Sequence, residues 1–412
     1  MRALEAVAIV LLAALFLVKG VIPALTTVRT DFANYYVSSY VLLHESQNID
    51  KLYEATWFGK KAAELGSPEG AIFQPFPPPT ALLMAPLALF DMQTAERILT
   101  VLSLGALVGL VSIISRLTAL DYPASLLLVL LSGFALINNF YLGQVYLLMA
   151  LCLALSIRCY LQGQDFVSGL YAGIFIPIKY FPICLLIFFL LQRRWLAAAS
   201  SVLMALTVLA VSLASMGWEI HWSYATRVLE HHLDGQMSNP FSLQYQSWNS
   251  ALRSLFLEDS ALNPHPLVDW PSGFGLVRGF VLVGLSALLF WVLRKGTHAN
   301  VGAPLQIAAL FSFGLIVAPA SATYHFLLLS LPVAMVASEL WKTHRLVPLS
   351  ILLLLYVGMG TTPVGALDRL NLAGAWRLLA YPRLFLLLAF FITIALLTKA
   401  QGLRERAQRA FT

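Results

Sequence analysis

Long apolar runs, each about as long as a membrane-crossing helix, alternate with short polar stretches along most of the chain. A helix needs about 20 mostly apolar residues to cross the hydrocarbon core of a bilayer. Run length and exclusion of charge predict about twelve transmembrane helices (range 11–13), at residues 6–22, 78–90, 95–116, 122–138, 141–161, 166–191, 195–216, 276–294, 304–319, 323–340, 346–361 and 379–398. We therefore expect an all-α polytopic membrane protein that forms a single domain over residues 1–412.

Two segments leave the helix count open. Residues 78–90 are few for a span, and the prolines around Lys179 can divide residues 166–191 into two half-helices. Between the spans, two polar segments are too long to be simple connections, at about residues 23–77 and 217–275. The first contains a predicted amphipathic helix from Tyr53 to Leu65, followed by a rigid, extended proline run from Phe73 to Pro79.

Composition agrees with a membrane protein and places the loops. Charged residues make up 11% of the chain, against about 25% in soluble proteins. Basic residues cluster beside four apolar runs, at Arg193-Arg194, Arg294-Lys295, Lys342 with Arg345, and Lys399 through Arg409. The positive-inside rule puts all four clusters, both termini and a tail at about 399–412 in the cytoplasm, and hence the two long loops on the outer side.

Lys179 is the most informative polar residue. It is the only Lys, Arg, Asp or Glu between Phe166 and Gln192, and Pro177 and Pro182 flank it. A charge at membrane depth costs about 2.5–3.5 kcal/mol on insertion scales, so it commonly faces a partner or a polar cavity. Lys179 is either a fixed cation for an anionic ligand or a lysine that extends to the membrane surface.

Asp31 begins a second polar group, followed by Asn34, Tyr35 and Tyr36 just after the first span. A carboxylate at the outer surface can take a proton from an acceptor hydroxyl, and aromatic side chains can stack on a sugar ring. The alternative is a helix cap beside an aromatic belt. Three other polar groups are weak signals taken singly: Gly143-Gln144, Trp248-Asn249 and His325.

Several kinds of site are disfavoured. Cys152, Cys159 and Cys184 all lie in apolar runs, which indicates small hydrophobic side chains and neither a disulfide framework nor a metal site. His231 and His232 are adjacent, so they do not readily point at one metal ion. A glycine-rich phosphate loop and an Asp-x-Asp pair are both missing from the sequence, which disfavours a cytoplasmic nucleotide-sugar enzyme.

In their order, these features resemble the C-type integral-membrane glycosyltransferases (GT-C), and specifically glycosyltransferase family 87, which includes polyprenol-phosphate-mannose-dependent mannosyltransferases. The resemblance runs from the first span to about residue 332 and is carried by Asp31-Phe-Ala-Asn-Tyr, Phe73 to Pro79, Gly143-Gln144-Val-Tyr, Ile178-Lys179-Tyr-Phe-Pro182, Arg193-Arg194-Trp195, Trp248-Asn249-Ser250, and Ala318-Pro319 with His325 and Pro332. The chain departs from the family by having Lys179-Tyr where Lys-Pro is common, and Trp248-Asn249-Ser250 where Asn-Gln-Ser is common.

The resemblance implies an inverting enzyme of the cell membrane. It would move a hexose, with mannose expected, from a polyprenyl-phosphate sugar to a lipid or glycan acceptor at the outer face, without a metal or other cofactor. Asp31 would be the catalytic base, and Lys179 and His325 would bind the donor phosphate. The implied substrate contacts are Asn34, Tyr35, Tyr36, Gln74, Gln144, Trp248 and Asn249.

Two other classes of protein stay open from the sequence. A secondary transporter or flippase for an anionic lipid or sugar would use Lys179 as a substrate or ion site, but such proteins usually contain repeats with paired broken helices. A non-catalytic membrane assembly subunit would carry these polar groups by accident. A pocket that joins Asp31 to Lys179 would disfavour both.

Overall fold

The computed structural model describes residues 2–67, 70–236, 239–296 and 302–410, and all regular elements in these ranges are helical. Within these ranges, six helices are long and apolar enough to cross a membrane, or up to seven if the bent pair at Tyr122–Leu130 and Phe134–Tyr141 forms one span. The six are Ala3–His44, Met92–Leu117, Trp195–Met216, Pro271–Arg294, Thr323–Lys342 and Pro382–Gln401. The prediction of an all-α polytopic membrane protein is confirmed.

The helix count differs from the expected twelve. Three further predicted spans form apolar helices of 10–17 residues, which are short for a complete crossing: Tyr146–Leu161, Gly302–Val317 and Leu346–Thr361. The span expected at 78–90 is wrong, because this segment forms only the short helix α5 (Thr80–Leu83) and the 3₁₀ turn η3 (Leu87–Leu89). Proline at position 86 lies between them and supplies no amide proton to continue a helix.

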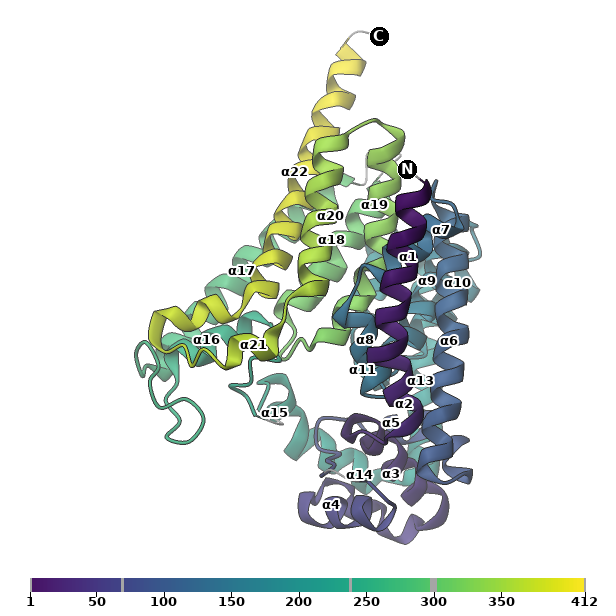
Figure 1. Ribbon diagram of the computed structural model, residues 1–412, viewed down its shortest axis with the longest axis vertical. Helices are drawn as coiled ribbons and strands as arrows, with labels where there is room; N and C mark the ends of the chain where they lie inside the picture. Colours follow the sequence, from purple (N-terminus) through teal and green to yellow (C-terminus); the bar gives the residue numbers. More distant parts are fainter. Residues whose placement is uncertain (1, 68–69, 237–238, 297–301, 411–412) are drawn as a thin grey trace. The chain divides into compact units, whose positions relative to one another are not determined.

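The chain forms two compact units, Met1–Ile113 with Leu136–Leu233, and Ile114–Ala135 with Asp234–Thr412. A single domain over the whole chain stays a prediction. In unit 1 the helices are α1 (Arg2–Phe16), η1 (Leu17–Val21), α2 (Ile22–Thr26), α3 (Thr30–His44), η2 (Ser46–Tyr53), α4 (Ala55–Glu64), α5, η3, most of α6 (Met92–Leu117) and α8 (Phe134–Tyr141), α9 (Tyr146–Leu161), α10 (Asp165–Gly173), α11 (Ile176–Lys179), α12 (Ile183–Leu191), α13 (Trp195–Met216), α14 (Trp218–Ser223), η4 (Tyr224–Val228) and α15 (Leu229–Leu233) (Figure 1).

Small residues bring α10 and α13 together in unit 1. A Cβ atom built on Gly169 would lie 1.9 Å from the Ser200 Oγ, and one on Gly173 would lie 2.4 Å from the Ser201 carbonyl oxygen. Neither glycine can therefore carry a side chain without separating the helices. Close approach through small residues is the usual way in which helices pack within a membrane.

The segment around Lys179 is broken, which settles the question that the sequence left open. Helix α10 ends at Gly173, α11 is a single turn that ends at Lys179, and α12 begins at Ile183. Tyr180 follows α11 with a φ of 52°, a left-handed conformation that is uncommon for a tyrosine. The polypeptide thus turns away at Lys179, so the lysine stands at a helix end.

The first long loop differs in part from its prediction. Helix α4 confirms a helix where residues 53–65 were expected to form one, although its placement on a membrane surface is untested. The run from Phe73 to Pro79 is not extended. It folds into turns, in which the Phe76 and Thr80 amides donate to the carbonyl oxygens of Phe73 and Pro77.

Unit 2 contains α7 (Tyr122–Leu130), α16 (Trp248–Phe256), α17 (Pro271–Gly296), α18 (Gly302–Val317), η5 (Thr323–Leu329), α19 (Ser330–Lys342), α20 (Leu346–Thr361), α21 (Val364–Asp368), η6 (Gly374–Ala380) and α22 (Pro382–Ala410). Helix α22 packs against α17, α18 and α20. The expected cytoplasmic tail at about 399–412 begins within α22, and the side chains of 402–412 lie outside the described residues.

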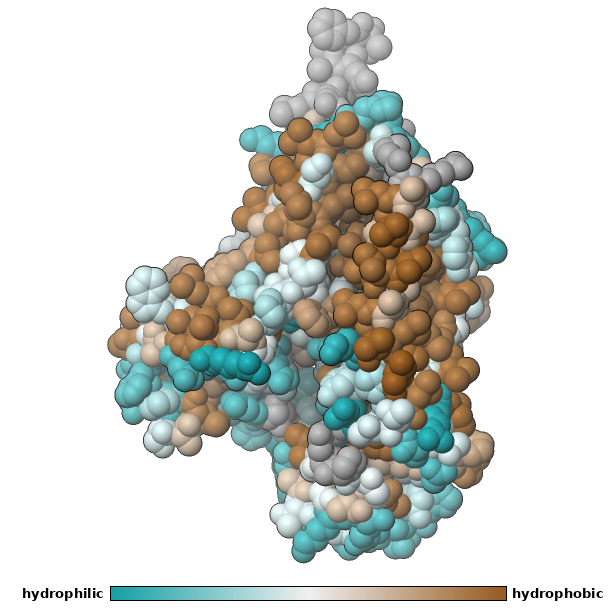
Figure 2. Space-filling view, viewed as in Figure 1, coloured by the Kyte–Doolittle hydropathy of each residue, from teal (hydrophilic) through white to brown (hydrophobic). Residues whose placement is uncertain are grey.

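Exposed apolar side chains mark the surfaces that face lipid. In unit 1 they cover α1, and in unit 2 they cover α20, both visible in brown in Figure 2. The residues involved are Leu4, Val7, Val10, Leu11 and Leu15 on α1, and Leu346, Val347, Ile351 and Leu354 on α20. A soluble protein rarely exposes apolar rows of this extent, which agrees with a multi-pass membrane protein.

Candidate functional site

Unit 1 brings Asp31, Tyr35 and Gln144 into one hydrogen-bonded chain. The Gln144 Nε2 donates to the Asp31 Oδ2 over 2.7 Å, and the Tyr35 hydroxyl donates to the Gln144 Oε1 over 2.6 Å. A carboxylate only accepts, so the amide nitrogen must face Asp31 and its oxygen must face Tyr35. Tyr35 therefore fixes the amide, and the amide fixes one oxygen of the carboxylate.

Local structure explains why these groups meet. Asp31 and Tyr35 are one helical turn apart on α3, so they lie on the same face. Asp31 is in the first turn, and the N-cap position belongs to Arg29, whose side chain makes no capping hydrogen bond. The N-cap alternative for Asp31 is thus wrong in its strict sense, although the first turn of a helix still favours a negative charge.

Gly143 lets the loop between α8 and α9 approach α3. Its φ is +65°, and a Cβ built on it would lie 2.5 Å from the Phe32 Cβ. Any other residue would push the loop away, and Gln144 with it. The pair Gly143-Gln144 therefore works together, because the glycine provides the close approach and the glutamine makes the contact.

Lys179 lies beside this chain, among aromatic rings. Its Nζ is 4.4 Å from the ring centroid of Phe76, 5.0 Å from that of Tyr35 and 5.3 Å from that of Tyr146. The charge of Asp31 acts on that of Lys179, but within the described ranges no carboxylate makes an ion pair with it. Ring faces stabilise a cation without neutralising it, so the ammonium remains available to an anion.

A second aromatic layer adjoins Lys179. The Tyr180 hydroxyl bonds to the Tyr224 hydroxyl, and the Tyr180 ring meets the His232 ring edge to face at 5.7 Å. Tyr224 in turn stacks on Tyr53. Burial first, and the charge of Lys179 second, lower the pKa of His232 from 6.5 to about 4, so this imidazole is neutral at physiological pH.

The remaining predicted contacts in unit 1 have partners within the protein. The Asn34 Oδ1 accepts from the Ile72 amide, the Tyr36 hydroxyl donates to the Phe90 carbonyl oxygen, and the Gln74 Nε2 donates to the Tyr53 carbonyl oxygen. The first two bonds tie residues 72 and 90 to α3, and the third joins two parts of the first long loop. Whether Asn34, Tyr36 or Gln74 also contacts a substrate stays a prediction.

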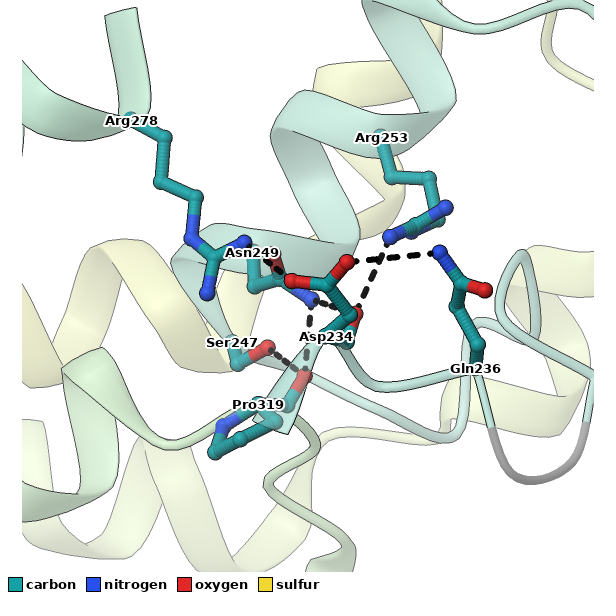
Figure 3. Close-up of polar contacts among 7 residues, drawn as sticks. All are labelled: Asp234, Gln236, Ser247, Asn249, Arg253, Arg278 and Pro319. Carbon is teal, nitrogen blue, oxygen red and sulfur yellow. Dashed lines mark hydrogen bonds and ion pairs between the residues drawn. The ribbon is translucent and has the colours of Figure 1, made fainter. Parts of the chain in front are cut away.

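Trp248 and Asn249 begin helix α16 in unit 2, where Ser247 caps the helix by accepting from the Ser250 amide. The Asn249 Nδ2 donates to the carbonyl oxygens of Asp234 and Pro319, as Figure 3 shows. The amide nitrogen thus has a structural role, while the Asn249 Oδ1 and the Trp248 Nε1 are buried without a hydrogen-bond partner.

His325 also belongs to unit 2. It lies in the 3₁₀ helix η5, where its Nδ1 accepts from the Ala322 amide over 3.2 Å and its ring contacts Tyr324. This bond leaves the Nε2 as the nitrogen that carries the proton when the ring is neutral. The predicted contact of His325 with a donor phosphate is untested.

Sequence reasoning missed Tyr146, Tyr180 and His232 as neighbours of Lys179. Tyr146 was visible as the last residue of the Gly143-Gln144-Val-Tyr motif, and Tyr180 as the residue after Lys179. Their aromatic side chains next to the key polar groups were the available signal. His232 gave none, because 53 positions of sequence separate it from Lys179.

Comparison with known proteins finds a matching family. The model of glycosyltransferase family 87 matches residues 73–319, a range that includes Lys179 and begins after Asp31. The chain is 30% identical over 329 residues to a polyprenol-phosphate-mannose-dependent alpha-(1-2)-phosphatidylinositol mannoside mannosyltransferase of Mycobacterium tuberculosis, covering 74% of this chain and 72% of the relative.

A second relative has a similar name. The chain is 28% identical over 282 residues to a polyprenol-phosphate-mannose-dependent alpha-(1-2)-phosphatidylinositol pentamannoside mannosyltransferase of Mycolicibacterium smegmatis, covering 67% of this chain and 62% of the relative. No solved structure matches the chain. With the family model and the first relative both covering most of the sequence, the chain belongs to glycosyltransferase family 87 and is a membrane glycosyltransferase.

Proposed function

We propose that the protein transfers a mannosyl residue from a polyprenyl-phosphate mannose to a glycolipid acceptor at the outer face of the cell membrane, with inversion at the anomeric carbon. The two relatives are named for this donor and for phosphatidylinositol mannoside acceptors, which supports the choice of donor and acceptor classes. The observation that carries the proposal is that unit 1 holds an oriented carboxylate, Asp31, and a cation, Lys179, in the same site.

Asp31 serves as the general base. An acceptor hydroxyl attacks the anomeric carbon, and its proton passes to the Asp31 carboxylate as the new glycosidic bond forms. The hydrogen bond from Gln144 to the Oδ2 holds the carboxylate in one orientation. Such positioning of a base accounts for a large share of the rate gain in enzymes that use one.

Lys179 stabilises the leaving group. As the bond from the anomeric carbon to the phosphate oxygen breaks, both electrons stay on that oxygen, and polyprenyl phosphate departs with one more negative charge. A cation that is already in place, in surroundings of low polarity, stabilises this growing charge. With Lys179 in that role, the transfer step proceeds without a metal ion.

The proposed topology follows from the positions of the basic clusters. Arg193-Arg194 and both termini lie in the cytoplasm, whereas Asp31 and residues 217–275 lie outside. Because residues 78–90 form no span, this topology requires the bent pair at Tyr122–Leu130 and Phe134–Tyr141 to be a re-entrant loop. Polyprenyl-linked sugars present their head group at the membrane surface, which suits a lysine at the end of a broken helix. Labelling of single cysteines with a membrane-impermeant reagent tests this topology.

A transfer assay tests the proposal as a whole. Purified protein in lipid nanodiscs receives polyprenyl phosphate carrying radiolabelled mannose, glucose, galactose or arabinose, together with phosphatidylinositol mannosides. We expect label to move from the mannose donor into the glycolipid, as an α-linked product from a β-linked donor. Transfer from GDP-mannose but not from the polyprenyl donor would contradict the proposal.

A further inference from the structure

A second charged cluster, around Asp234, lies entirely in unit 2 (Figure 3). The Arg278 Nη1 contacts the Asp234 Oδ1 at 2.9 Å, and the Arg253 Nη2 donates to the Asp234 carbonyl oxygen at 3.0 Å. Asn249 donates to the same carbonyl oxygen. The Gln236 Nε2 donates to the Asp234 Oδ2 at 3.5 Å, so two guanidinium groups and two carboxamides surround one aspartate.

The cluster is held firmly in place. Arg253 and Arg278 both lie over the ring of Phe274, with centroid distances of 5.2 Å and 5.8 Å. Gly235 has a φ of +73°, and a Cβ on it would lie 2.8 Å from the Asn249 Nδ2, so the loop can approach only with glycine at this position. These contacts give the arginines a fixed geometry before any ligand arrives.

Among the described residues, three buried polar atoms of the cluster lack partners: the Arg253 Nε, the Asn249 Oδ1 and the Trp248 Nε1. Arg253 is 6% exposed and Asn249 is 5% exposed, so bulk water does not readily satisfy them. Burial and the charge of Arg278 lower the pKa of Arg253, and Asp234 is the carboxylate that opposes this effect. The cluster thus has an excess of donors and of positive charge.

The surroundings of the cluster indicate the kind of ligand. Arg278 is near the start of α17, a helix long and apolar enough to cross a membrane. Leu282, one helical turn further along α17 and on the same face as Arg278, is 45% exposed. A ligand at Arg278 therefore meets charge at one end and a lipid-facing apolar surface at the other, as an anionic lipid requires.

We propose that Trp248, Arg253 and Arg278 form a binding site for the phosphodiester of an anionic glycerolipid, which is the acceptor of the transfer reaction. This inference rests on the proposed function for the acceptor role alone. The Arg278–Asp234 ion pair is partly exposed, with side chains 35% and 44% accessible. Arg278 can exchange this carboxylate for a phosphate, which guanidinium groups bind through paired hydrogen bonds.

Direct binding tests the site independently of catalysis. Wild-type protein in detergent is titrated with dioctanoyl phosphatidylinositol, dioctanoylglycerol or inorganic phosphate, and binding is followed by native mass spectrometry. We expect phosphatidylinositol to bind best, and Arg278→Gln to weaken it by about tenfold or more, the usual loss for a charge-assisted hydrogen bond. Equal binding of phosphatidylinositol and dioctanoylglycerol, or displacement by an equal concentration of inorganic phosphate, would overturn the proposal.

Arg294→Gln is the matched control. Arg294 lies at the opposite end of α17 and is also stacked on a phenylalanine, Phe290, at 5.4 Å. This variant should bind phosphatidylinositol as wild type does. An equal loss in both variants would mean that the lipid senses overall charge and that the cluster is no specific site.

Asp234→Asn separates ligand binding from a purely structural role. The backbone carbonyl that accepts from Asn249 and Arg253 remains, while the charge that competes for Arg278 is removed. We expect this variant to bind phosphatidylinositol more tightly than wild type does. If Arg253 and Arg278 serve only to pair with Asp234, the variant will melt earlier and gain no affinity, which would contradict the proposal.

Transfer kinetics distinguish the lipid site itself from its role in binding the acceptor. If phosphatidylinositol mannosides accept mannose, Arg278→Gln should raise the KM for that acceptor about tenfold and leave the KM for the donor unchanged. An unchanged acceptor KM would overturn the acceptor role of the site. If wild type transfers no mannose although the binding differences hold, the proposed function fails and the lipid site stands.

Discussion

The site around Lys179 in unit 1 and the cluster around Asp234 in unit 2 differ in what surrounds their cations. In unit 1 the ammonium of Lys179 lies among the rings of Tyr35, Phe76 and Tyr146, and the carboxylate of Asp31 is held by a neutral amide. In unit 2 the Arg278 guanidinium contacts the carboxylate of Asp234 directly. Aromatic rings leave a charge uncompensated, whereas an ion pair neutralises much of it.

This difference suits two different tasks. A site that performs a reaction needs a base and a cation that are held in place without neutralising each other in an ion pair, and unit 1 has this arrangement. A site that only binds can keep its arginines paired until a better anion displaces the aspartate. In the proposed roles, a carboxylate and a cation serve chemistry in unit 1 and recognition in unit 2, according to what surrounds them.

The largest expected effect comes from Asp31→Asn. The variant keeps the shape and can still accept from Gln144, but it cannot take a proton. We expect kcat to fall by roughly 10²–10⁴-fold with donor affinity retained, measured with radiolabelled donor at saturating acceptor.

Asp91→Asn is its control, because Asp91 also lies at the start of a helix in unit 1, where it accepts from the Thr94 amide. This variant should turn over as wild type does. Near-normal turnover of Asp31→Asn would show that unit 1 contains no base at this position.

A smaller effect is expected from Tyr35→Phe. Without the hydroxyl, the Gln144 amide loses the bond that fixes its orientation and can turn its oxygen toward Asp31. We expect kcat to fall about tenfold with little change in either KM, since the base is misplaced but both substrates still bind.

Tyr356→Phe tests whether loss of any buried tyrosine hydroxyl is enough to lower kcat. Tyr356 is equally buried, in unit 2, and its hydroxyl bonds to Ser330. If this variant loses as much kcat as Tyr35→Phe, the hydrogen-bonded chain from Tyr35 through Gln144 to Asp31 has no special role.

The sequence predicted the membrane class and the separate parts of the unit 1 site. Apolar run length was sufficient for helices such as α6, α13 and α22, which bury only part of their surface and face lipid elsewhere. Lys179 stood out because it lies within an apolar run and Asp31 because it lies beside one, whereas Gln144 was a weak signal taken singly. Charge is so costly in such surroundings that it usually has a function.

Other features depend on tertiary contacts and were not predictable from periodicity. The segment at 78–90 is as apolar as a span, but its helices are broken at proline and pack against α3 within unit 1. The Asp234–Arg278 pair was missed because 44 residues separate its members and each alone looks like an ordinary surface charge. Asn34 has a loop amide as partner, which a short motif cannot reveal.

The smallest expected effect concerns pH and His232. The folded pKa of about 4 lies below the usual value of 6.5, so between these pH values the unfolded chain binds more protons than the folded protein does. This contribution to stability is therefore complete above pH 6.5 and decreases as the pH falls toward 4. We expect the melting temperature to fall over this range, and His232→Gln to flatten the fall.

His231→Gln changes the exposed neighbouring histidine and serves as control. Its melting curve should keep the wild-type dependence on pH. Since Lys179 contributes to the lowered pKa of His232, Lys179→Met should also reduce the slope. An unchanged slope in His232→Gln would mean that other groups cause the pH dependence.

The most direct test of the proposed mechanism is the affinity of the Lys179→Met variant for the donor. Methionine keeps the apolar stem and packs well against the rings of Tyr35, Phe76 and Tyr146, so the protein should fold and melt at or above the wild-type temperature. With the cation removed, we predict that polyprenyl-phosphate mannose binds at least about tenfold more weakly and that transfer is nearly abolished, while Lys179→Arg keeps part of the activity. A folded Lys179→Met variant with wild-type donor affinity and turnover would contradict the assignment of Lys179 to the donor phosphate.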